Sequence, residues 1–329
     1  VSYTLQDGNG SKGGFASNYT LANTTATANI TAKAITISGL TVIDKVYDGG
    51  TNATLNKSSA TLTGLISGDV VSLSTTNASA TYTSANAANE IAVTVTGNTI
   101  SGTDSSNYTL TQPTLTGKIT PKALTISGIT ATTSKQYDQT NSVAVSGTPS
   151  LTGSASSSTD GKYYGSDVGI TGAVTASYNS VNVATANQIA FDISGVSLTG
   201  SAAKVGDYTL TALTPVAGAI TPKSLTVSGL TVASTKVYDN TTSATITGTA
   251  AIAGVISGDS VVLNGTPVAT YSSKDVGTSI PVNFSGLSLS GTSAGNYSLV
   301  MQGATSANIT PKTLTVQGVT VASSKIYDG

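Results

Sequence analysis

The stretch Ile220-Thr221-Pro222-Lys223-Ser224-Leu225-Thr226-Val227-Ser228-Gly229 decides the fold. Residues 224–228 alternate polar and apolar side chains, and this period of two is typical of a half-buried β-strand. Proline fixes its own φ and biases the preceding residue toward extended backbone, so the chain enters the strand through a stiff junction. Gly229 is a turn signal that ends the strand. The stretch therefore predicts a proline junction that leads directly into a β-domain.

The same pattern occurs four times. Its Ile-Thr-Xaa-Lys core stands at 30–33, 119–122, 220–223 and 309–312, so that the lysines lie 89, 101 and 89 residues apart (122 − 33, 223 − 122 and 312 − 223). The third position is proline in three copies (Pro121, Pro222 and Pro311). Ala32 replaces it in the first copy, where we expect a looser joint. A unit of roughly 90 residues can bury a core of its own, unlike a short solenoid repeat.

Two further markers recur in phase with the junctions. The first marker is Tyr-Asp, which occurs at Tyr47-Asp48, Tyr137-Asp138, Tyr238-Asp239 and Tyr327-Asp328. The second marker is Asn or Asp followed by Tyr-Thr-Leu or Tyr-Ser-Leu, and its tyrosines are Tyr19, Tyr108, Tyr208 and Tyr297. The markers divide the chain into three whole repeats, 33–121, 122–222 and 223–311, of which the second has an insertion. The C-terminal part of a preceding repeat, 1–32, comes before them, and the start of a following repeat, 312–329, comes after them. We expect the sequence to be an excerpt of a longer protein.

The fold class that these patterns predict is all-β. In the third repeat the period of two continues through residues 245–247, 282–284, 287–289 and 297–299, with turn signals at short intervals and no convincing helical stripe. Seven or so short strands per repeat are typical of an immunoglobulin-like β-sandwich. We expect tandem sandwiches in an elongated array, each with a separate core; β-grasp-like modules, with a short helix on one sheet, are the alternative.

The markers have structural interpretations. We expect the tyrosine of Tyr-Asp to be a core residue, and the aspartate to accept hydrogen bonds from the amides of the following turn. The next residue is Gly49, Asn240 or Gly329 in three copies, and both residue types tolerate positive φ. Gln139 does not fit, so the second repeat is expected to turn differently. The Asn-Tyr-Thr-Leu marker resembles a tyrosine corner, in which the hydroxyl bonds to the upstream backbone.

Composition excludes several classes of function. The chain has no His, Cys or Trp, its 14 basic residues are all lysines, and Glu90 is its single glutamate. Catalytic triads, thiol nucleophiles and ordinary zinc sites are therefore excluded, and we expect no enzyme, cofactor or metal. A net charge of −1 without clustered cations argues against nucleic-acid binding. No apolar stretch is long enough for a membrane-spanning helix.

The insertion in the second repeat contains a candidate ligand site. Tyr163 and Tyr164 are adjacent aromatic residues in the segment 154–165. Exposed tyrosines could stack on a sugar ring, which would make this repeat a glycan-binding module. The alternative, which we favour, is that both rings cover the flank of their own repeat. Elsewhere, the lysine after each junction is expected to be a solvated charge on an edge strand.

The motifs resemble those of a known family. They are Lys-Val-Tyr-Asp-Gly, Ser-Gly-Asp-Val, Ser-Lys-Asp-Val-Gly, Ala-Gly-Asn-Tyr-Ser-Leu and Ile-Thr-Pro-Lys, here at 45–49, 67–70, 273–277, 294–299 and 309–312. They are similar to YDG-type repeats, relatives of MBG repeats, which occur in large exported bacterial proteins that resemble filamentous haemagglutinins. The resemblance covers essentially the whole chain. It implies an adhesin at the cell surface or outside the cell, often exported by two-partner secretion, and it implies no catalytic residues.

We therefore expect a stalk or fibre segment that spaces a binding tip or builds an extracellular filament or biofilm matrix. Its expected partners are the neighbouring repeats of the same chain. Two alternatives remain open at this point: a glycan- or protein-binding repeat, and a subunit that assembles with other copies of itself by strand donation.

Overall fold

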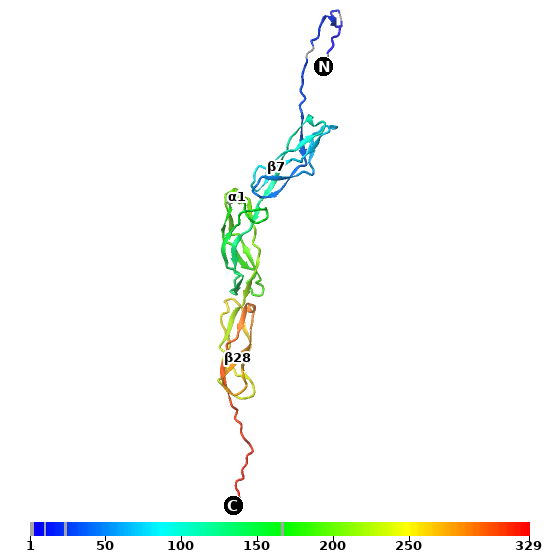
Figure 1. Cartoon of the computed structure of the whole chain (residues 1–329). Coiled ribbons are helices and arrows are strands. Elements are labelled where there is room, and N and C mark those ends of the chain that lie inside the picture. Colours follow the sequence, from blue (N-terminus) through cyan, green and yellow to red (C-terminus); the bar gives the residue numbers. More distant parts are fainter. Residues whose placement is uncertain (1–2, 10, 23–24, 166–167) are drawn as a thin grey trace. The chain divides into compact units, whose positions relative to one another are not determined.

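The computed structural model describes residues 3–9, 11–22, 25–165 and 168–329. The chain divides into two compact units, Val1–Lys122 and Ala123–Gly329, which we describe separately. Strands follow one another along residues 33–310 (Figure 1), which confirms the all-β prediction. Among the described residues, no helix has the length and apolar character needed to cross a membrane.

The first repeat forms mixed sheets. A six-stranded sheet has the order β2-β4-β7-β8-β11-β3, and β10-β1-β5 and β6-β9 form smaller sheets. The strands are β1 (Lys33–Ser38), β2 (Thr41–Ile43), β3 (Lys45–Val46), β4 (Asn52–Asn56), β5 (Thr61–Thr63), β6 (Ser72–Ser74), β7 (Ser79–Tyr82), β8 (Ala88–Thr96), β9 (Thr99–Ser101), β10 (Tyr108–Leu110) and β11 (Thr114–Thr120). The 3₁₀ turn η2 (Ser105–Asn107) leads into β10.

The second repeat is built of smaller sheets. They are the pairs β12-β20, β13-β15, β14-β22 and β16-β19, and the three-stranded sheet β17-β18-β21. The elements are β12 (Lys122–Leu124), β13 (Ser127–Ala131), β14 (Ser134–Gln136), β15 (Val145–Ser150), β16 (Val168–Gly172), β17 (Thr175–Tyr178), β18 (Gln188–Asp192), β19 (Val196–Gly200), α1 (Ala202–Gly206), β20 (Tyr208–Leu210), β21 (Val216–Ala217) and β22 (Ala219–Thr221).

The third repeat contains a five-stranded sheet, β24-β30-β28-β27-β25, and a three-stranded sheet, β26-β23-β29. Its elements are β23 (Lys223–Ser228), β24 (Thr235–Val237), β25 (Ser243–Ala244), β26 (Ala251–Ile252), β27 (Val262–Tyr271), β28 (Gly277–Ser290), η3 (Ala294–Asn296), β29 (Tyr297–Val300) and β30 (Thr305–Thr310). On β23, Leu225 and Val227 are buried while the residues between and after them are exposed, as the alternating sequence predicts.

Parallel pairing distinguishes these sheets from a purely antiparallel sandwich. Strand β1 pairs in parallel with β10, and β23 with β29. The strand that leads into the Tyr-Asp loop also runs parallel to the last strand of its repeat, as in β3 with β11, β14 with β22 and β24 with β30. Parallel neighbours require long crossovers, which here span most of a repeat. The immunoglobulin-like and β-grasp-like arrangements therefore stay predictions, although helix α1 is only five residues long.

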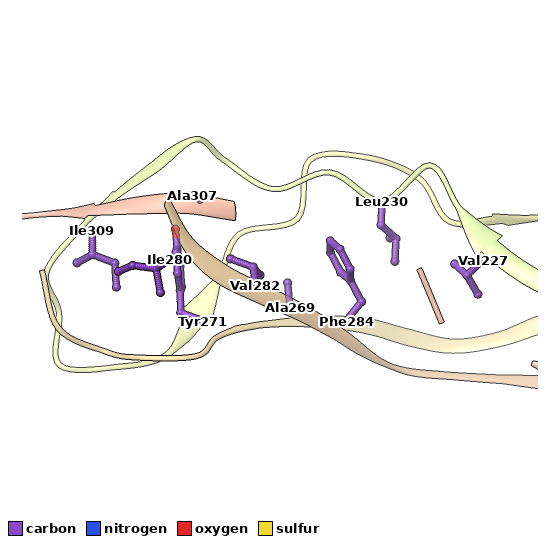
Figure 2. Close-up of a cluster of buried hydrophobic side chains, with 9 residues drawn as sticks. All are labelled: Val227, Leu230, Ala269, Tyr271, Ile280, Val282, Phe284, Ala307 and Ile309. Carbon is purple, nitrogen blue, oxygen red and sulfur yellow. The ribbon is translucent and has the colours of Figure 1, made fainter. Parts of the chain in front are cut away.

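Each of the last two repeats has an apolar core, and a third cluster joins them. The core of the third repeat is a row of nine buried side chains, including Leu230, Val282 and Phe284 (Figure 2). Ile126, Val174 and Val196 form the core of the second. The third cluster contains residues of both repeats: Tyr137, Tyr178, Ala186, Ile189 and Ile220 from the second, and Leu225 and Tyr297 from the third. The prediction of separate cores is therefore wrong at this joint.

The segments on either side of the three repeats form no strands among the described residues. Before residue 33 the structure has only the 3₁₀ turn η1 (Ala16–Asn18), and Tyr19 is 65% exposed, although its counterpart Tyr108 is 6% exposed. After residue 310, Leu314 is 87% exposed, whereas its counterpart Leu225 is fully buried. We expected 1–32 and 312–329 to be parts of repeats. They carry the markers, but a strand needs pairing partners from the rest of its repeat.

Truncation of Leu230 tests the core of the third repeat. Leu230→Ala should lower the free energy of unfolding of this repeat by about 2–5 kcal/mol, because a fully buried leucine loses its contacts and leaves a cavity. Leu314→Ala, at an exposed position, should change it by less than about 0.5 kcal/mol. Native-state hydrogen exchange of the amides in β27 and β28 measures both values. Equal effects of the two substitutions would contradict the assigned core.

Candidate functional site

A lysine–aspartate ion pair organises each Tyr-Asp loop. The lysine two residues before the tyrosine contacts the aspartate one residue after it, with Nζ–Oδ1 distances of 2.7, 2.7 and 2.8 Å. The three pairs are Lys45–Asp48, Lys135–Asp138 and Lys236–Asp239. The lysine side chains are 15–19% exposed and the aspartates about half exposed. Sequence patterns alone suggested no role for this lysine, although its constant spacing from the aspartate was a usable signal.

Each of these lysines also lies over a second tyrosine. The distances from Nζ to the ring centroids of Tyr82, Tyr178 and Tyr271 are 5.6, 6.0 and 5.5 Å. These rings are 1–2% exposed and belong to the cores of their repeats. A cation within about 6 Å of an aromatic face is attracted by the ring quadrupole. The lysine therefore ties the surface loop to the core beneath it.

The aspartate holds the turn as predicted. Its Oδ1 accepts a hydrogen bond from the backbone N–H two residues later, at 2.9 Å from Gly50, Thr140 and Thr241. The residue between has positive φ in every repeat: 77° at Gly49, 68° at Gln139 and 66° at Asn240. The prediction of a different turn at Gln139 is therefore wrong. Gln139 takes the same strained conformation, and its side chain has a partner across the joint.

Hydrogen bonding lowers the pKa of these carboxyl groups. The hydrogen bond from Lys236, followed by those from Thr241, lowers the pKa of Asp239 to about 2. For Asp48 and Asp138, burial acts to raise the pKa, but hydrogen bonds from the lysine and the turn outweigh it and lower the value. A depressed carboxyl pKa favours the folded state above the unfolded value near 3.8, and this contribution disappears as the pH falls toward 2.

The tyrosine of the Asn-Tyr marker bonds to the backbone, as predicted, but about 40 residues upstream. The hydroxyl of Tyr108 accepts from the N–H of Ile66 at 3.0 Å and donates to Asp69 at 2.5 Å. Tyr297 repeats both contacts, with the Ile256 N–H at 3.0 Å and with Asp259 at 2.5 Å. One hydroxyl therefore connects the start of a late strand to a Ser-Gly-Asp turn early in the same repeat.

In the second repeat the insertion supplies this contact. The hydroxyl of Tyr208 accepts from the backbone N–H of Tyr164 at 2.9 Å and donates to its carbonyl at 3.3 Å. The ring of Tyr163 packs against Gly153: a Cβ atom at residue 153 would lie 2.9 Å from the Tyr163 ring. Both Tyr163 and Tyr164 are half-buried. The structure thus places the two candidate ligand residues against their own repeat, and glycan binding by them stays an untested prediction.

The Tyr-Asp loop of the second repeat meets the Asn-Tyr end of the third. The Tyr137 hydroxyl donates to Asp259 Oδ1 at 3.2 Å, and its ring lies edge-on to that of Tyr297, with centroids 5.4 Å apart and an interplanar angle of 73°. The side chain of Gln139 donates to the carbonyl of Ser257 at 3.0 Å. Asp259 therefore accepts one tyrosine from each repeat.

A second loop completes this joint. Asn296 accepts from the backbone N–H of Val183 at 2.9 Å and donates to the side chain of Asn182 at 3.0 Å. Asn296 is consequently only 6% exposed. The shared apolar cluster includes Tyr137 of the first loop, and partly buried residues such as Val183 of the second loop, Val255 and Val261 pack against it. The joint thus combines a hydrophobic centre with hydrogen bonds at two sides.

The joint shifts the pKa values of its acidic groups apart. Burial acts to raise the pKa of Asp259, but hydrogen bonds from Tyr297, Tyr137, Gln139 and Ser293 outweigh it, and the net shift is downward. Burial raises the pKa of Tyr137 and Tyr297, and the hydrogen bond to Asp259 raises both further. A carboxyl group whose pKa is lower in the folded than in the unfolded protein stabilises the fold while it is ionised. The joint is therefore most stable at neutral pH and becomes less stable in acid, where Asp259 is protonated.

The proline junctions lie where the sequence predicts. Pro121 separates β11 from β12, Pro222 separates β22 from β23, and Pro311 follows β30. The solvent exposure of the lysine after the junction varies more than expected. Lys33 and Lys312 are exposed, Lys223 is half-buried and Lys122 is fully buried. The prediction of a solvated edge lysine is therefore wrong for Lys122.

The family described as the YDG domain matches residues 31–116, 120–215 and 221–307. The chain belongs to the YDG domain family. The three letters are the Tyr47-Asp48-Gly49 sequence of the first repeat, where the ion-paired turn is built. Searches of curated proteins and of solved structures gave no match. Within the described part of the chain, no group of three or more acidic side chains is placed to hold a metal ion.

Removal of Lys236 tests the origin of the low pKa in the YDG loop. Lys236→Met should raise the pKa of Asp239 from about 2 toward 3.8, because the hydrogen bond that lowers this pKa most is lost. Lys274→Met, which removes a more exposed lysine beside Asp275, should leave the pKa of Asp239 unchanged. Carbon-detected NMR titration of the carboxyl groups measures these values. An unchanged pKa in Lys236→Met would contradict the assigned cause.

Two substitutions of Gln139 separate strain from hydrogen bonding. Gln139→Ala should lower the free energy of unfolding by about 0.5–1.5 kcal/mol, because the bond to Ser257 is lost while positive φ remains. Gln139→Gly loses the same bond but relieves roughly 1 kcal/mol of backbone strain, so its free energy of unfolding should be closer to that of the unsubstituted chain. Urea unfolding followed by circular dichroism measures the difference, with Gln136→Ala as an exposed control. If alanine were no less stable than glycine, the strain would be absent.

Proposed function

We propose that this chain is a spacer segment of a bacterial protein at the cell surface or outside the cell, in which YDG repeats hold one another in fixed orientation. The joint between the second and third repeats is the observation that carries the proposal. The resemblance to repeats of haemagglutinin-like exported proteins supports an adhesin stalk or matrix filament, with export by two-partner secretion.

The energetics of the joint support a stiff connection. Fixing the backbone of one residue in a single conformation costs about 1–2 kcal/mol of conformational entropy. One proline restricts only its own backbone and that of its neighbour, so it could not by itself hold two domains in one orientation. A typical hydrogen bond contributes about 0.5–1.5 kcal/mol and an edge-to-face aromatic pair a similar amount. The four hydrogen bonds across the joint, the ring pair and the shared apolar cluster together oppose bending in more than one direction.

The chemistry of the chain also suits a passive role outside the cell. Without cysteine it cannot form wrong disulfides during export, and without histidine its charge hardly changes between pH 5 and 8. The ion pairs of the YDG loops keep their carboxylates charged in mildly acidic surroundings, as the pKa of Asp239 near 2 indicates. A spacer with these properties keeps its geometry over a wide range of conditions.

Distance measurements within the whole chain test the stiffness. Spin labels on Thr175→Cys and Thr270→Cys, which are exposed strand positions in the second and third repeats of a cysteine-free chain, should give a narrow distance distribution. Tyr137→Ser should broaden it at least two-fold, because the ring and its bond to Asp259 are lost. Tyr238→Ser, the same change in a loop that makes no such joint here, is the matched control.

A double variant and a protease assay complete this test. Tyr137→Phe combined with Gln139→Gly removes two joint hydrogen bonds while the core ring is kept, so it should broaden the distribution without lowering the circular-dichroism signal. A broad distribution in the parent, or no broadening in either joint variant, would contradict a stiff spacer. Protease accessibility of the repeats on intact source cells tests the location: full protection would contradict a surface protein.

A further inference from the structure

One side of the joint between the second and third repeats contains two hydrogen bonds to the same side-chain amide. The backbone N–H of Val183 donates to Oδ1 of Asn296 at 2.9 Å, and Nδ2 of Asn296 donates to Oδ1 of Asn182 at 3.0 Å. A backbone N–H can only donate, so it fixes the side-chain oxygen of Asn296 toward Val183 and the amide nitrogen toward Asn182. Residue 182 must therefore present an acceptor whenever residue 296 is an asparagine.

The position of Asn182, which we call the loop position, has an equivalent in every repeat. It lies four residues after the core tyrosine that the lysine of the YDG loop contacts, and its residues are Asn86, Asn182 and Asp275. In each repeat its N–H donates to the hydroxyl of the serine two residues earlier, at 3.1, 3.0 and 3.1 Å. The local turn is therefore the same, and only the side chain differs between an amide and a carboxylate.

The position of Asn296, which we call the marker position, is also shared. It directly precedes the tyrosine of the second sequence marker, and its residues are Asn107, Asp207 and Asn296. In each repeat its N–H donates to the carbonyl three residues earlier, at 3.0, 3.2 and 3.0 Å. Asn296 is 6% exposed and Asp207 is fully buried, so the fold of a repeat accommodates either an amide or a carboxylate here.

Asparagine and aspartate at these two positions allow four combinations, and hydrogen-bond chemistry favours three of them. An asparagine at the loop position can turn its amide, so that it accepts from an asparagine or donates to an aspartate at the marker position. An ionised aspartate at the loop position only accepts, so it suits an asparagine. Two aspartates would place like charges against one another without a proton between them, where water is largely excluded, and this combination is strongly unfavourable.

We propose that the loop and marker positions form a pairing code, which determines which YDG repeat can follow which in an array. By this code Asp275 restricts the third repeat to a following repeat with asparagine at the marker position, and it excludes a repeat of the second type, which has Asp207. Asn182 accepts either type. In the order of the sequence, Asn86 precedes Asp207 and Asn182 precedes Asn296, so no aspartate precedes an aspartate. The code rests on the proposed function, because it names the partner for which the joint of the spacer is specific.

Transplanting the two aspartates into the joint of the whole chain tests the code. Asn182→Asp introduces the residue of the third repeat at the loop position, and Asn296→Asp introduces that of the second repeat at the marker position. The measured quantity is the hydrogen-exchange protection factor of the Val183 N–H, which donates to residue 296 across the joint. Each single substitution should change it by less than about five-fold, because a hydrogen-bonded pair remains. In the double variant it should fall at least about ten-fold below the product of the single effects.

Two controls separate the code from general effects of charge and of unfolding. Val181 is exposed in the same loop, so Val181→Asp combined with Asn296→Asp adds the same two charges. Because Asn182 can still turn its amide, the protection of Val183 should stay within about three-fold of its value in Asn296→Asp alone. The N–H of Ala186 bonds to the Asn182 carbonyl at 2.9 Å within the second repeat, and it should keep its protection in every variant.

Three results would overturn the code. They are a double variant whose protection equals the product of the single effects, a Val181 control that is as poorly protected as the double variant, and an equal loss of protection at Ala186, which would mean that the loop itself opens. This test and the test of the spacer function can fail separately. Coupling at Val183 with broad spin-label distances in the unsubstituted chain would refute the spacer and keep the code, and narrow distances without coupling would do the reverse.

Discussion

A tyrosine hydroxyl held between a backbone N–H and a carboxylate is the interaction on which the joint depends. In the first and third repeats this hydroxyl belongs to Tyr108 and Tyr297, and it fixes the Ser-Gly-Asp turn against the start of strand β10 or β29. Because a carboxylate has two oxygens, Asp259 still accepts a second tyrosine from the neighbouring repeat on Oδ1. The same carboxylate therefore serves the fold of one repeat and the contact between two.

The all-β class and the local turns were predictable from local sequence, whereas the parallel strand pairing and the joint were not. The alternation at Leu225 and Val227, the proline junctions and the turn at Asp48 depend on residues close together in the chain, so their periodicity and spacing predicted them. The contact between Tyr137 and Asp259 joins residues 122 positions apart, and nothing local indicates which ends of the repeats meet. The lysine of the YDG loop lies between these cases, since its ion pair is local but its tyrosine partner belongs to a distant strand.

Errors in the sequence predictions have a common physical cause. Gln139 was expected to change the turn because propensity disfavours positive φ, and the tertiary hydrogen bond to Ser257 overrides that preference. Lys122 was expected in solvent because lysine is rarely buried, yet it is fully buried in its strand context. Tyr19 carries a marker but is exposed, because the strands that would cover it are not formed around it. In each case the environment, rather than the residue type, determines the outcome.

The residue after Tyr-Asp shows how one position can set the properties of a joint. Glycine adopts positive φ without strain, but it has no side chain that reaches the next repeat. Glutamine costs roughly 1 kcal/mol in the same conformation and returns a similar amount through its bond to Ser257. Asparagine tolerates the conformation better and reaches less far. Gly49, Gln139 and Asn240 therefore represent three compromises between an unstrained turn and a specific contact, made within one fold and without any change in the ion pair that supports the loop.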